Sequence, residues 1–449
     1  MKRPPPIQWS YMSALPAVAW PAVPTAAASS VLSLLFQLDQ SQWLAVESLE
    51  ERQREQLAVL LEHAYRTVPW YRERWDGAPG VPGLSQLPLL SRRDLQDSFA
   101  GLRSSAVPPE HGVIAETRTS GSTGAPVRVV RTAFHDLMWR ALSLRDHRWH
   151  RRELSGTLAA IRRGFGRGSS PSWGQATEGL VETGPCLTLD VDIDAASQLE
   201  WLQRHDPACL LTYPSLAAEL ARMSLERGVK LPGLREVRTL GESLGEDLRA
   251  LCREAWGVPL VDMYSAEEVG YLALQCPDHA HYHVQSESVI VEILDDAGRP
   301  CAPGETGRVV VTELHNFAMP LVRYDIGDYA ELGEPCPCGR GLPVLNRILG
   351  RTRNMLVAPD GRRYWPSLGS RRLGDTPGIR QHQFVQAEAD LVEVRLVADR
   401  RLSETEEEKL RRHVLSRLPA GFRVRVAYCE RIERGAGGKF EYFLSRIAG

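Results

Sequence analysis

The middle of the chain alternates between two patterns of hydrophobic positions. Short apolar runs bounded by turn residues are typical of buried strands, whereas apolar positions three and four residues apart indicate helices. From residue 100 to residue 330 the two patterns take turns, which predicts βαβ units and a mostly parallel sheet. The predicted strands are residues 113–117, 209–212, 237–240 and 258–262, and the predicted helices are residues 134–144, 215–226 and 246–256.

The segments on either side of this alternation follow other patterns. Residues 50–67 place apolar side chains on one stripe and predict an amphipathic helix, which Pro69 ends. Residues 289–294 and 308–314 are apolar runs separated by turn residues, so they predict an antiparallel pair. The apolar stripe of the first helix consists of Leu57, Leu60, Leu61 and Ala64.

Residues 350–449 have the pattern of a separate, smaller unit. A helix is predicted over residues 404–418, with Ser403 as its N-cap and Glu406 completing a capping box. We therefore expect a large α/β domain over residues 1–349 and a small α+β domain over residues 350–449. The strands predicted beside the helix are residues 391–397 and 423–428.

The composition narrows the class of protein. A chain of 449 residues is long enough for more than one domain, and 43% hydrophobic with 24% charged residues is ordinary for a globular protein. The net charge of -2 at pH 7 gives no reason to expect a nucleic acid or an anionic membrane as a partner. The eight cysteines suggest no disulfide framework, so we expect a reducing compartment such as the cytoplasm.

The N-terminal segment is apolar but interrupted. Pro16, Pro21 and Pro24 divide residues 13–36, so no apolar run reaches the roughly 18 residues that a membrane-spanning helix needs. We expect this segment to be an arm that packs on the domain or on a neighbouring molecule, and the second arrangement would make a homodimer.

A loop of small residues follows the first predicted strand. Glycine lets a backbone turn with positive φ, and consecutive N–H groups in such a turn hold anions, of which a nucleotide phosphate is the obvious candidate. The alternative is a flexible linker. The run is not a P-loop, because no lysine follows Gly124. It consists of Thr119, Ser120, Gly121, Ser122, Thr123 and Gly124, followed by Ala125 and Pro126.

Two clusters of cysteine and histidine lie about sixty residues apart. Thiolate and imidazole are the ligands of structural zinc, and four of them make a closed tetrahedral site. The alternative is a set of unmetallated thiols beside surface histidines. We expect the ligands to be Cys276, His283, Cys336 and Cys338, with His281 or His279 as replacements for His283.

Seven short motifs occur in order along essentially the whole chain. Together they resemble the adenylate-forming superfamily of acyl-CoA synthetases and adenylation domains, and most closely its phenylacetate–CoA ligase branch. The resemblance implies a large, layered N-terminal domain and a mobile C-terminal lid. Besides the small-residue loop, the motifs are Tyr213-Pro214-Ser215, Gly241-Glu242, YSAEEVG from Tyr264, MPLVRYDIGD ending at Asp328, Gly350-Arg351 and Gly437-Gly438-Lys439.

The resemblance also implies a reaction in two halves. A carboxylate attacks the α-phosphate of ATP to give an acyl-adenylate and pyrophosphate, and a thiol then displaces AMP. The small-residue loop would hold the pyrophosphate, Glu268 would hold Mg²⁺, and Lys439 would be the catalytic lysine on the lid. Glu267 replaces the usual hydroxyl residue and Ser265 replaces a glycine, which leaves open which of the two acids faces the metal.

Further roles follow at positions that match the family's motifs. Tyr264 would lie against the adenine, Asp328 would bond both ribose hydroxyls, and Arg351 would add donors to the ribose or phosphate. Arg353 stands at the hinge position, where the family often has Asp or Lys. The remaining nucleotide-binding candidates are Gly241, Glu242, Asp262 and Ser265, and the acid pocket is expected near Tyr213, Pro214, Ser215 and Ala266.

The motifs specify the acid and its acceptor less closely. The resemblance implies an aryl acid and coenzyme A. A carrier-protein thiol, an amine or no transfer at all is the alternative, and a non-catalytic ATP-binding relative is a third hypothesis. An arginine-rich stretch from Arg140 to Arg152 could bind the 3′-phosphate of coenzyme A or simply face solvent.

Overall fold

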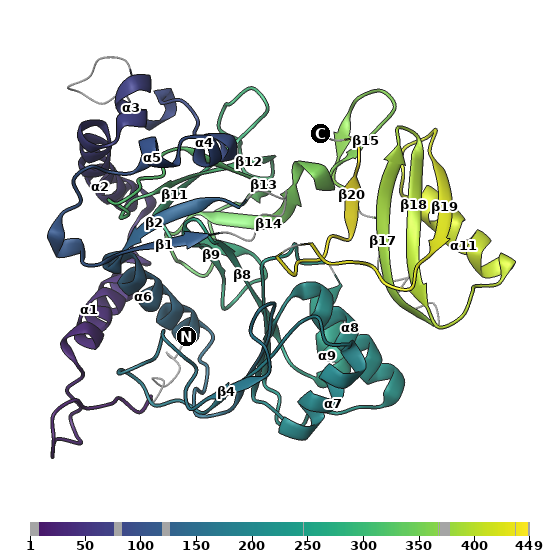
Figure 1. The fold of residues 1–449 in the computed structure, drawn as a ribbon, viewed down its shortest axis with the longest axis horizontal. Helices are drawn as coiled ribbons and strands as arrows, with labels where there is room; N and C mark the ends of the chain where they lie inside the picture. Colours follow the sequence, from purple (N-terminus) through teal and green to yellow (C-terminus); the bar gives the residue numbers. More distant parts are fainter. Residues whose placement is uncertain are drawn as a thin grey trace.

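The computed structural model describes residues 9–75, 83–118, 126–245, 247–366, 368, 378–435 and 437–447. The chain forms a large α/β part and a smaller α+β part, which lies at the right of Figure 1. A twelve-stranded sheet runs through the large part in the order β11-β12-β13-β14-β10-β9-β8-β7-β6-β3-β5-β4. The predicted fold class is therefore confirmed. The domain boundary predicted at residue 350 falls within β14, the strand of this sheet that comes last along the chain.

One half of the large sheet is parallel. β5, β3, β6, β7 and β8 lie side by side in this order, and each pairs in parallel with its neighbour. Helices α7, α8 and α9 gather on one side of these strands (Figure 1), where they bury a leucine-rich core, as the predicted βαβ units require. These elements are β3 (Leu158–Ile161), β4 (Gly168–Ser170), β5 (Cys186–Leu189), α7 (Ala195–His205), β6 (Cys209–Thr212), α8 (Pro214–Arg227), β7 (Glu236–Leu240), α9 (Leu248–Trp256) and β8 (Leu260–Ala266).

The other half is antiparallel, so the prediction of a mostly parallel sheet was wrong. Its strands are joined by turns and loops rather than helices, and residues 267–269 alone reverse the chain between β8 and β9. The predicted antiparallel pair is confirmed as β11 and β12. The strands are β9 (Gly270–Gln275), β10 (Tyr282–Val284), β11 (Val289–Leu294), β12 (Thr306–Glu313), β13 (Tyr324–Leu332) and β14 (Val344–Arg351).

The first predicted strand does not belong to a βαβ unit. β1 (Ile114–Arg118) and β2 (Arg128–Thr132) form an antiparallel hairpin that is separate from the large sheet. Helix α6 (Ala133–Trp149) starts directly after β2. The prediction was wrong here because the local apolar pattern of a short strand does not identify its partner. The phosphate-binding loop predicted at residues 119–124 lies outside the described residues.

One pair of helices covers the opposite face of the parallel strands, and the other N-terminal helices pack on the antiparallel half. α1 (Ala26–Ser41) packs on α6, and both share a core with Met263 of β8, whereas Leu260 of the same strand packs with α7, α8 and α9. α2 (Val46–Thr67) buries the predicted leucine stripe and ends before Pro69, as predicted. The remaining helices of this region are α3 (Pro69–Arg74), α4 (Arg92–Asp97) and α5 (Phe99–Leu102).

The N-terminal arm packs partly on the domain. Tyr11 forms a bridge with Val181, and the backbone N–H of Met12 donates to the carbonyl of Leu180 at 2.9 Å. The predicted homodimer stays a prediction. Along the described segments, no helix combines the length and the apolar character that crossing a membrane requires.

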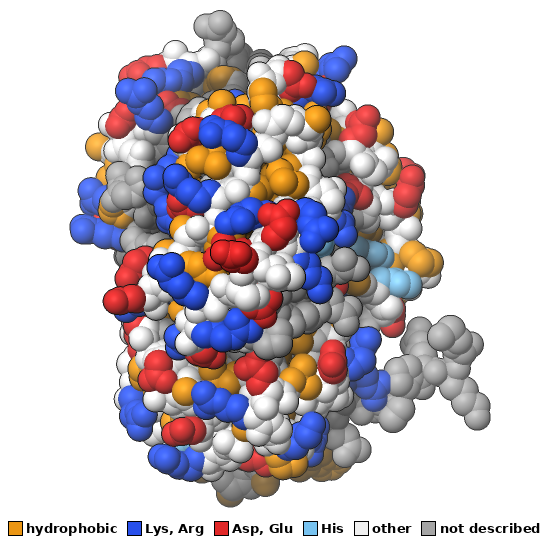
Figure 2. Space-filling view, turned by 90° about the vertical axis from the view of Figure 1, so that its right-hand side faces the viewer, with side chains coloured by type: hydrophobic (Ala, Val, Ile, Leu, Met, Phe, Trp, Pro, Cys, Tyr) orange, Lys and Arg blue, Asp and Glu red, His pale blue; other side chains and the backbone are white. Residues whose placement is uncertain are grey.

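The small part is a four-stranded sheet in the order β19-β18-β17-β20, with helix α11 beside it. Ser403 and Glu406 form the predicted capping box, and α11 ends at Leu415, three residues before the predicted end. Figure 2 faces this part and shows basic and acidic side chains interspersed. Arg400 and Glu406, for example, form an ion pair of 2.7 Å. The elements are β17 (Ile379–Glu388), β18 (Leu391–Ala398), α11 (Glu404–Leu415), β19 (Arg423–Tyr428) and β20 (Phe443–Ser445).

A buried ion cluster joins α6 to the parallel strands. Asp146, on α6, accepts hydrogen bonds from Arg152 at 2.5 Å and from Arg238 of β7 at 2.8 Å. Arg152 also pairs with Glu236 at 2.5 Å. Because all these groups are buried, each depends on its partner for compensation of its charge. The cluster therefore fixes α6 against the strands whose ends form the cavity described below.

Candidate active site

A cavity of about 970 Å³ lies between the carboxyl ends of the parallel strands and the small part. Parallel strands present their carboxyl ends at the same edge of a sheet, which places Gly241 after β7 next to the end of β8. Residues 264–266 belong to β8 itself, so this strand is longer than predicted. The predicted site residues that line the cavity are Pro214, Gly241, Glu242, Asp262, Tyr264, Ser265, Ala266, Glu268, Asp328, Arg351, Arg353 and Lys439.

Asp328 and two partners form a polar group on one wall. Its Oδ2 accepts a hydrogen bond from the Tyr264 hydroxyl at 2.9 Å, and its Oδ1 accepts from Nε of Arg351 at 3.2 Å. Asp328 and Arg351 are paired residues of β13 and β14, so the sheet sets their separation. Burial, reinforced by the Asp328 charge, raises the pKa of Tyr264 well above its usual value, so its hydroxyl stays a donor.

Glu268 faces a basic residue that the sequence analysis missed. Its Oε1 accepts a hydrogen bond from Nη1 of Arg92 at 3.0 Å, and both residues line the cavity. Arg92 is the first residue of α4, whose start is fixed by a capping box of Ser91 and Asp94. That serine-to-aspartate spacing was the available signal for the position of Arg92. Glu267 and Glu268 both line the cavity, and they differ in that Glu268 is buried and Glu267 is exposed.

Gly241 leaves room for the side chain of Lys439 at the cavity. Its φ of +79° suits glycine, and a Cβ at this position would lie 3.2 Å from Cε and 3.7 Å from Nζ of Lys439. The lysine side chain therefore crosses directly over the glycine. Beside it, the carboxylate of Glu242 contacts Ser215 of the large part and Phe440 of the small part.

The side chains of Asp262 and Tyr213 form hydrogen bonds to neighbouring segments of the chain. The Asp262 carboxylate accepts hydrogen bonds from Thr239 at 2.6 Å and from the Tyr282 hydroxyl at 2.7 Å. Burial raises the pKa of Asp262 to about 6. The Tyr213 hydroxyl donates to the carbonyl of Gly437 at 3.4 Å, on the loop that carries Lys439. Both residues therefore support neighbouring segments of the site.

The predicted hinge directly follows β14, which is the last strand of the large sheet along the chain. Arg353 belongs to a short 3-10 helix, η3 (Thr352–Asn354), directly after β14. Its Nε donates to Glu441 at 2.7 Å, and Asn354 donates to the carbonyl of Phe443 at 2.8 Å. The connection thus contacts the segment that follows Lys439.

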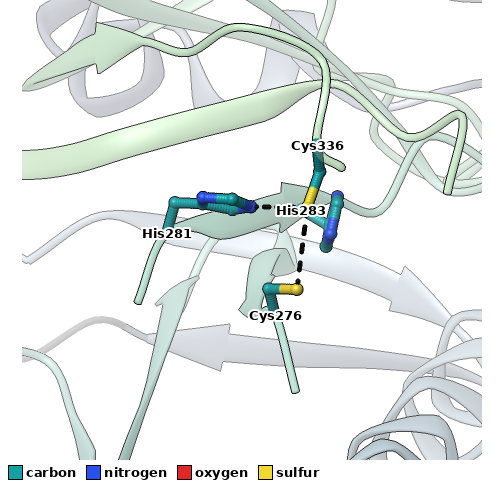
Figure 3. Close-up of side chains that lie close together, drawn as sticks. All are labelled: Cys276, His281, His283 and Cys336. Carbon is teal, nitrogen blue, oxygen red and sulfur yellow. Dashed lines mark hydrogen bonds between the residues drawn. The ribbon is translucent and has the colours of Figure 1, made fainter. Parts of the chain in front are cut away.

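The cysteine and histidine clusters come together beside the end of β9 and β10. Figure 3 shows His281 and Cys276 directed toward Cys336, with His281 Nε2 3.0 Å and Cys276 Sγ 3.9 Å from Cys336 Sγ. The ligand atoms of Cys276, His281, His283 and Cys336 all lie within 4.8 Å of one another. Cys338 lies at the margin, with its Sγ 3.5 Å from His283 Nε2.

These residues suit a structural metal. Burial lowers the pKa of the His283 imidazole to about 4 and raises the pKa of the Cys276 and Cys336 thiols. Two thiols and two imidazoles within one ion's reach are a zinc-type donor set. The four ligand atoms that lie together include those of both His281 and His283. Either His281 or Cys338 is therefore the fourth ligand candidate.

Comparisons with known proteins agree with this architecture. A model of the AMP-binding enzyme family matches residues 108–319, and a model of the CapK C-terminal domain matches residues 370–446. The chain is 30% identical over 337 residues to the phenylacetate–coenzyme A ligase of Thermus thermophilus, covering 69% of this chain and 72% of that enzyme. It is 26% identical over 341 residues to the ligase of the same name from Pseudomonas putida, covering 71% and 74%.

Solved structures show the same fold. The 2-hydroxyisobutyryl-CoA ligase in the postadenylation state, in complex with R3-HIB-AMP, matches with a TM-score of 0.71 at 20% identity, covering 91% of this chain and 92% of that one. An anthranilate–CoA ligase in complex with anthranoyl-AMP matches with a TM-score of 0.56 at 18% identity, covering 73% and 64%. The chain therefore belongs to the phenylacetate–coenzyme A ligase branch of the adenylate-forming enzymes.

Proposed function

We propose that the protein uses ATP to activate an aryl carboxylic acid as its adenylate and then transfers the acyl group to coenzyme A. The observation that carries this proposal is the convergence of Glu268, Asp328, Arg351 and Lys439 on one cavity from separate segments of the chain. Curated relatives named phenylacetate–coenzyme A ligase support the aryl acid and the acceptor.

The wall formed by Asp328, Arg351 and Tyr264 supports a role in nucleotide binding. A carboxylate offers two acceptor oxygens, which suits the two hydroxyls of a ribose. The Tyr264 hydroxyl and Arg351 hold this carboxylate in place through bonds of 2.9 and 3.2 Å. The Tyr264 ring would then lie against the adenine, next to Gly241.

The neighbouring pair of Glu268 and Arg92 would supply charge for the phosphates. Glu268 would hold Mg²⁺, which neutralises phosphate oxygens when it is bound. Arg92, 3.0 Å from the same carboxylate, adds a positive charge at this position. The loop of residues 119–124 would hold the pyrophosphate.

Lys439 would act where the acid meets the α-phosphate. Both reactants are anions, so their approach requires a cation placed between them. The lysine enters the cavity from the small part across Gly241, which supports this role. Transfer to the thiol then requires the small part to move, with the hinge proposed at Arg353.

Other acceptors remain as the second candidate function. A carrier-protein thiol or an amine would use the same first half-reaction. A non-catalytic ATP-binding relative is disfavoured, since such a protein has no need for a lysine at the position of Lys439.

A pyrophosphate-release assay tests the proposal. The protein is incubated with ATP, Mg²⁺ and a panel of aryl, fatty and amino acids, and then with coenzyme A. We expect an aryl acid to stimulate release and coenzyme A to give a thioester. Release without a thioester would favour another acceptor, and no release with any acid would contradict an enzyme. Lys439→Ala should abolish release while ATP still binds.

We also propose a structural zinc ion held by Cys276, His283, Cys336 and either His281 or Cys338. It would connect the end of β9 and β10 to the segment between β13 and β14. Metal analysis of the purified protein should find one zinc per chain. Cys336→Ser should lose it, whereas Cys186→Ser, a control on β5 outside the cluster, should keep it. Protein purified without stoichiometric zinc would contradict the proposal.

A further inference from the structure

One buried carboxylate joins the two parts of the molecule. The side chain of Glu242 is only 2% exposed. Its Oε2 accepts a hydrogen bond from the backbone N–H of Ser215 at 2.9 Å, and its Oε1 accepts one from the Ser215 hydroxyl at 3.1 Å. From the small part, the backbone N–H of Phe440 donates to Oε1 at 2.5 Å. Phe440 is the residue directly after Lys439.

Arg434 completes the arrangement from the other side of the lysine. Its Nη1 donates to the Ser215 hydroxyl at 2.8 Å, to Oε1 of Glu242 at 3.3 Å and to the carbonyl of Gly438 at 3.3 Å. The Arg434 side chain is 12% exposed, so its charge is largely removed from water. A single guanidinium therefore contacts the large part and the lysine loop at once.

These contacts place Lys439 inside a small closed turn. The backbone N–H of Gly435 donates to the carbonyl of Lys439 at 2.9 Å, and that of Gly438 donates to the carbonyl of Gly435 at 2.8 Å. Bonds to Arg434 and Glu242 hold the residues on both sides of the lysine. The lysine itself is exposed, and its position depends on its backbone.

We propose that Arg434 and Glu242 form a latch that places Lys439 for adenylation and that must open before the acyl group is transferred. Arg434 is thus a positioning residue, which acts through the backbone on either side of the lysine. The inference rests on the proposed role of Lys439. It extends that proposal to the coupling between the two half-reactions.

The charges explain why the latch is both firm and reversible. A buried carboxylate is costly without donors, so Glu242 strongly favours the docked position of the small part. Movement of the small part would remove Arg434 and the Phe440 amide together and would expose the carboxylate to water, which replaces the lost donors. Weakening the latch should therefore slow the half-reaction that uses Lys439 and spare the one that follows.

The test compares Arg434→Met with Arg431→Met. Arg431 is a matched control in the same segment, because it is exposed and pairs with exposed Glu433. For Arg434→Met we expect pyrophosphate release at saturating ATP and acid to fall roughly 30-fold or more, as expected when a charge-stabilising group is misplaced. Thioester formation from supplied acyl-adenylate should be unchanged or faster. Arg434→Lys should recover part of the loss.

The outcomes separate the latch from the proposed function. If Lys439→Ala abolishes release and Arg434→Met does not reduce it, the latch is wrong and the ligase stands. Equal losses in both half-reactions would show general damage and also overturn the latch. If no acid stimulates pyrophosphate release by the wild type, hydrogen exchange of the Phe440 amide still tests the latch. This amide should exchange faster in Arg434→Met than in Arg431→Met. Equal exchange in the two variants would overturn the latch.

Discussion

Replacement of Asp328 by asparagine tests the nucleotide-binding wall most directly. The carboxylate lies between the Tyr264 hydroxyl and Arg351, at 2.9 and 3.2 Å, and in the proposed function it also accepts both ribose hydroxyls. Asparagine keeps the shape but loses the charge and one acceptor. A hydrogen bond to a charged group contributes about 1.5–3 kcal/mol. Since every 1.4 kcal/mol is tenfold, KM for ATP should rise roughly 10- to 100-fold.

The assay is pyrophosphate release at varied ATP, repeated with 2′-deoxy-ATP. The wild type should discriminate against the deoxynucleotide, because one partner of Asp328 is missing. Asp328→Asn should discriminate far less, since its bond to that hydroxyl is already weakened. Asp325→Asn is the control: Asp325 lies on the same strand and pairs with Arg308 at 3.2 Å. Equal discrimination by the wild type and Asp328→Asn would refute the reasoning.

Three further predictions concern charge. Arg92→Met should lower pyrophosphate release by about tenfold or more, because the phosphates lose a nearby cation; unchanged kcat and KM would contradict this. Asp146→Ala should lower the free energy of unfolding by about 3–5 kcal/mol, since two buried arginines lose their shared partner. Urea unfolding measures this free energy, and a loss below about 1 kcal/mol would contradict the prediction. Burial raises the pKa of Asp262 to about 6, so its stabilising contribution is full below about pH 4 and is lost as pH rises through 6. Asp262→Asn should therefore gain melting temperature relative to the wild type between pH 5 and 7.5, and a constant difference would contradict the assignment.

Local patterns determined much of this protein. Strands β6, β7 and β8 and helices α8 and α9 of the parallel half follow from short apolar runs and helical stripes, because these periods depend on near neighbours alone. The capping box at Ser403 is local in the same way. The order of short motifs also placed Gly241, Tyr264, Asp328 and Lys439 in one proposed site, and the structure brings all four to one cavity.

Only the tertiary structure decided which groups meet. β1 pairs with β2, and β9 to β14 form an antiparallel half, because strand pairing depends on turns and distant partners that a local apolar period does not encode. Arg92 reaches Glu268 across 176 positions, and Arg434 reaches Glu242 across 192. A buried charge is costly unless it is paired, so these groups lie beside an opposite charge from a distant part of the chain. The sequence alone therefore indicated many of the elements and the class of chemistry, and the fold decided which distant side chains meet.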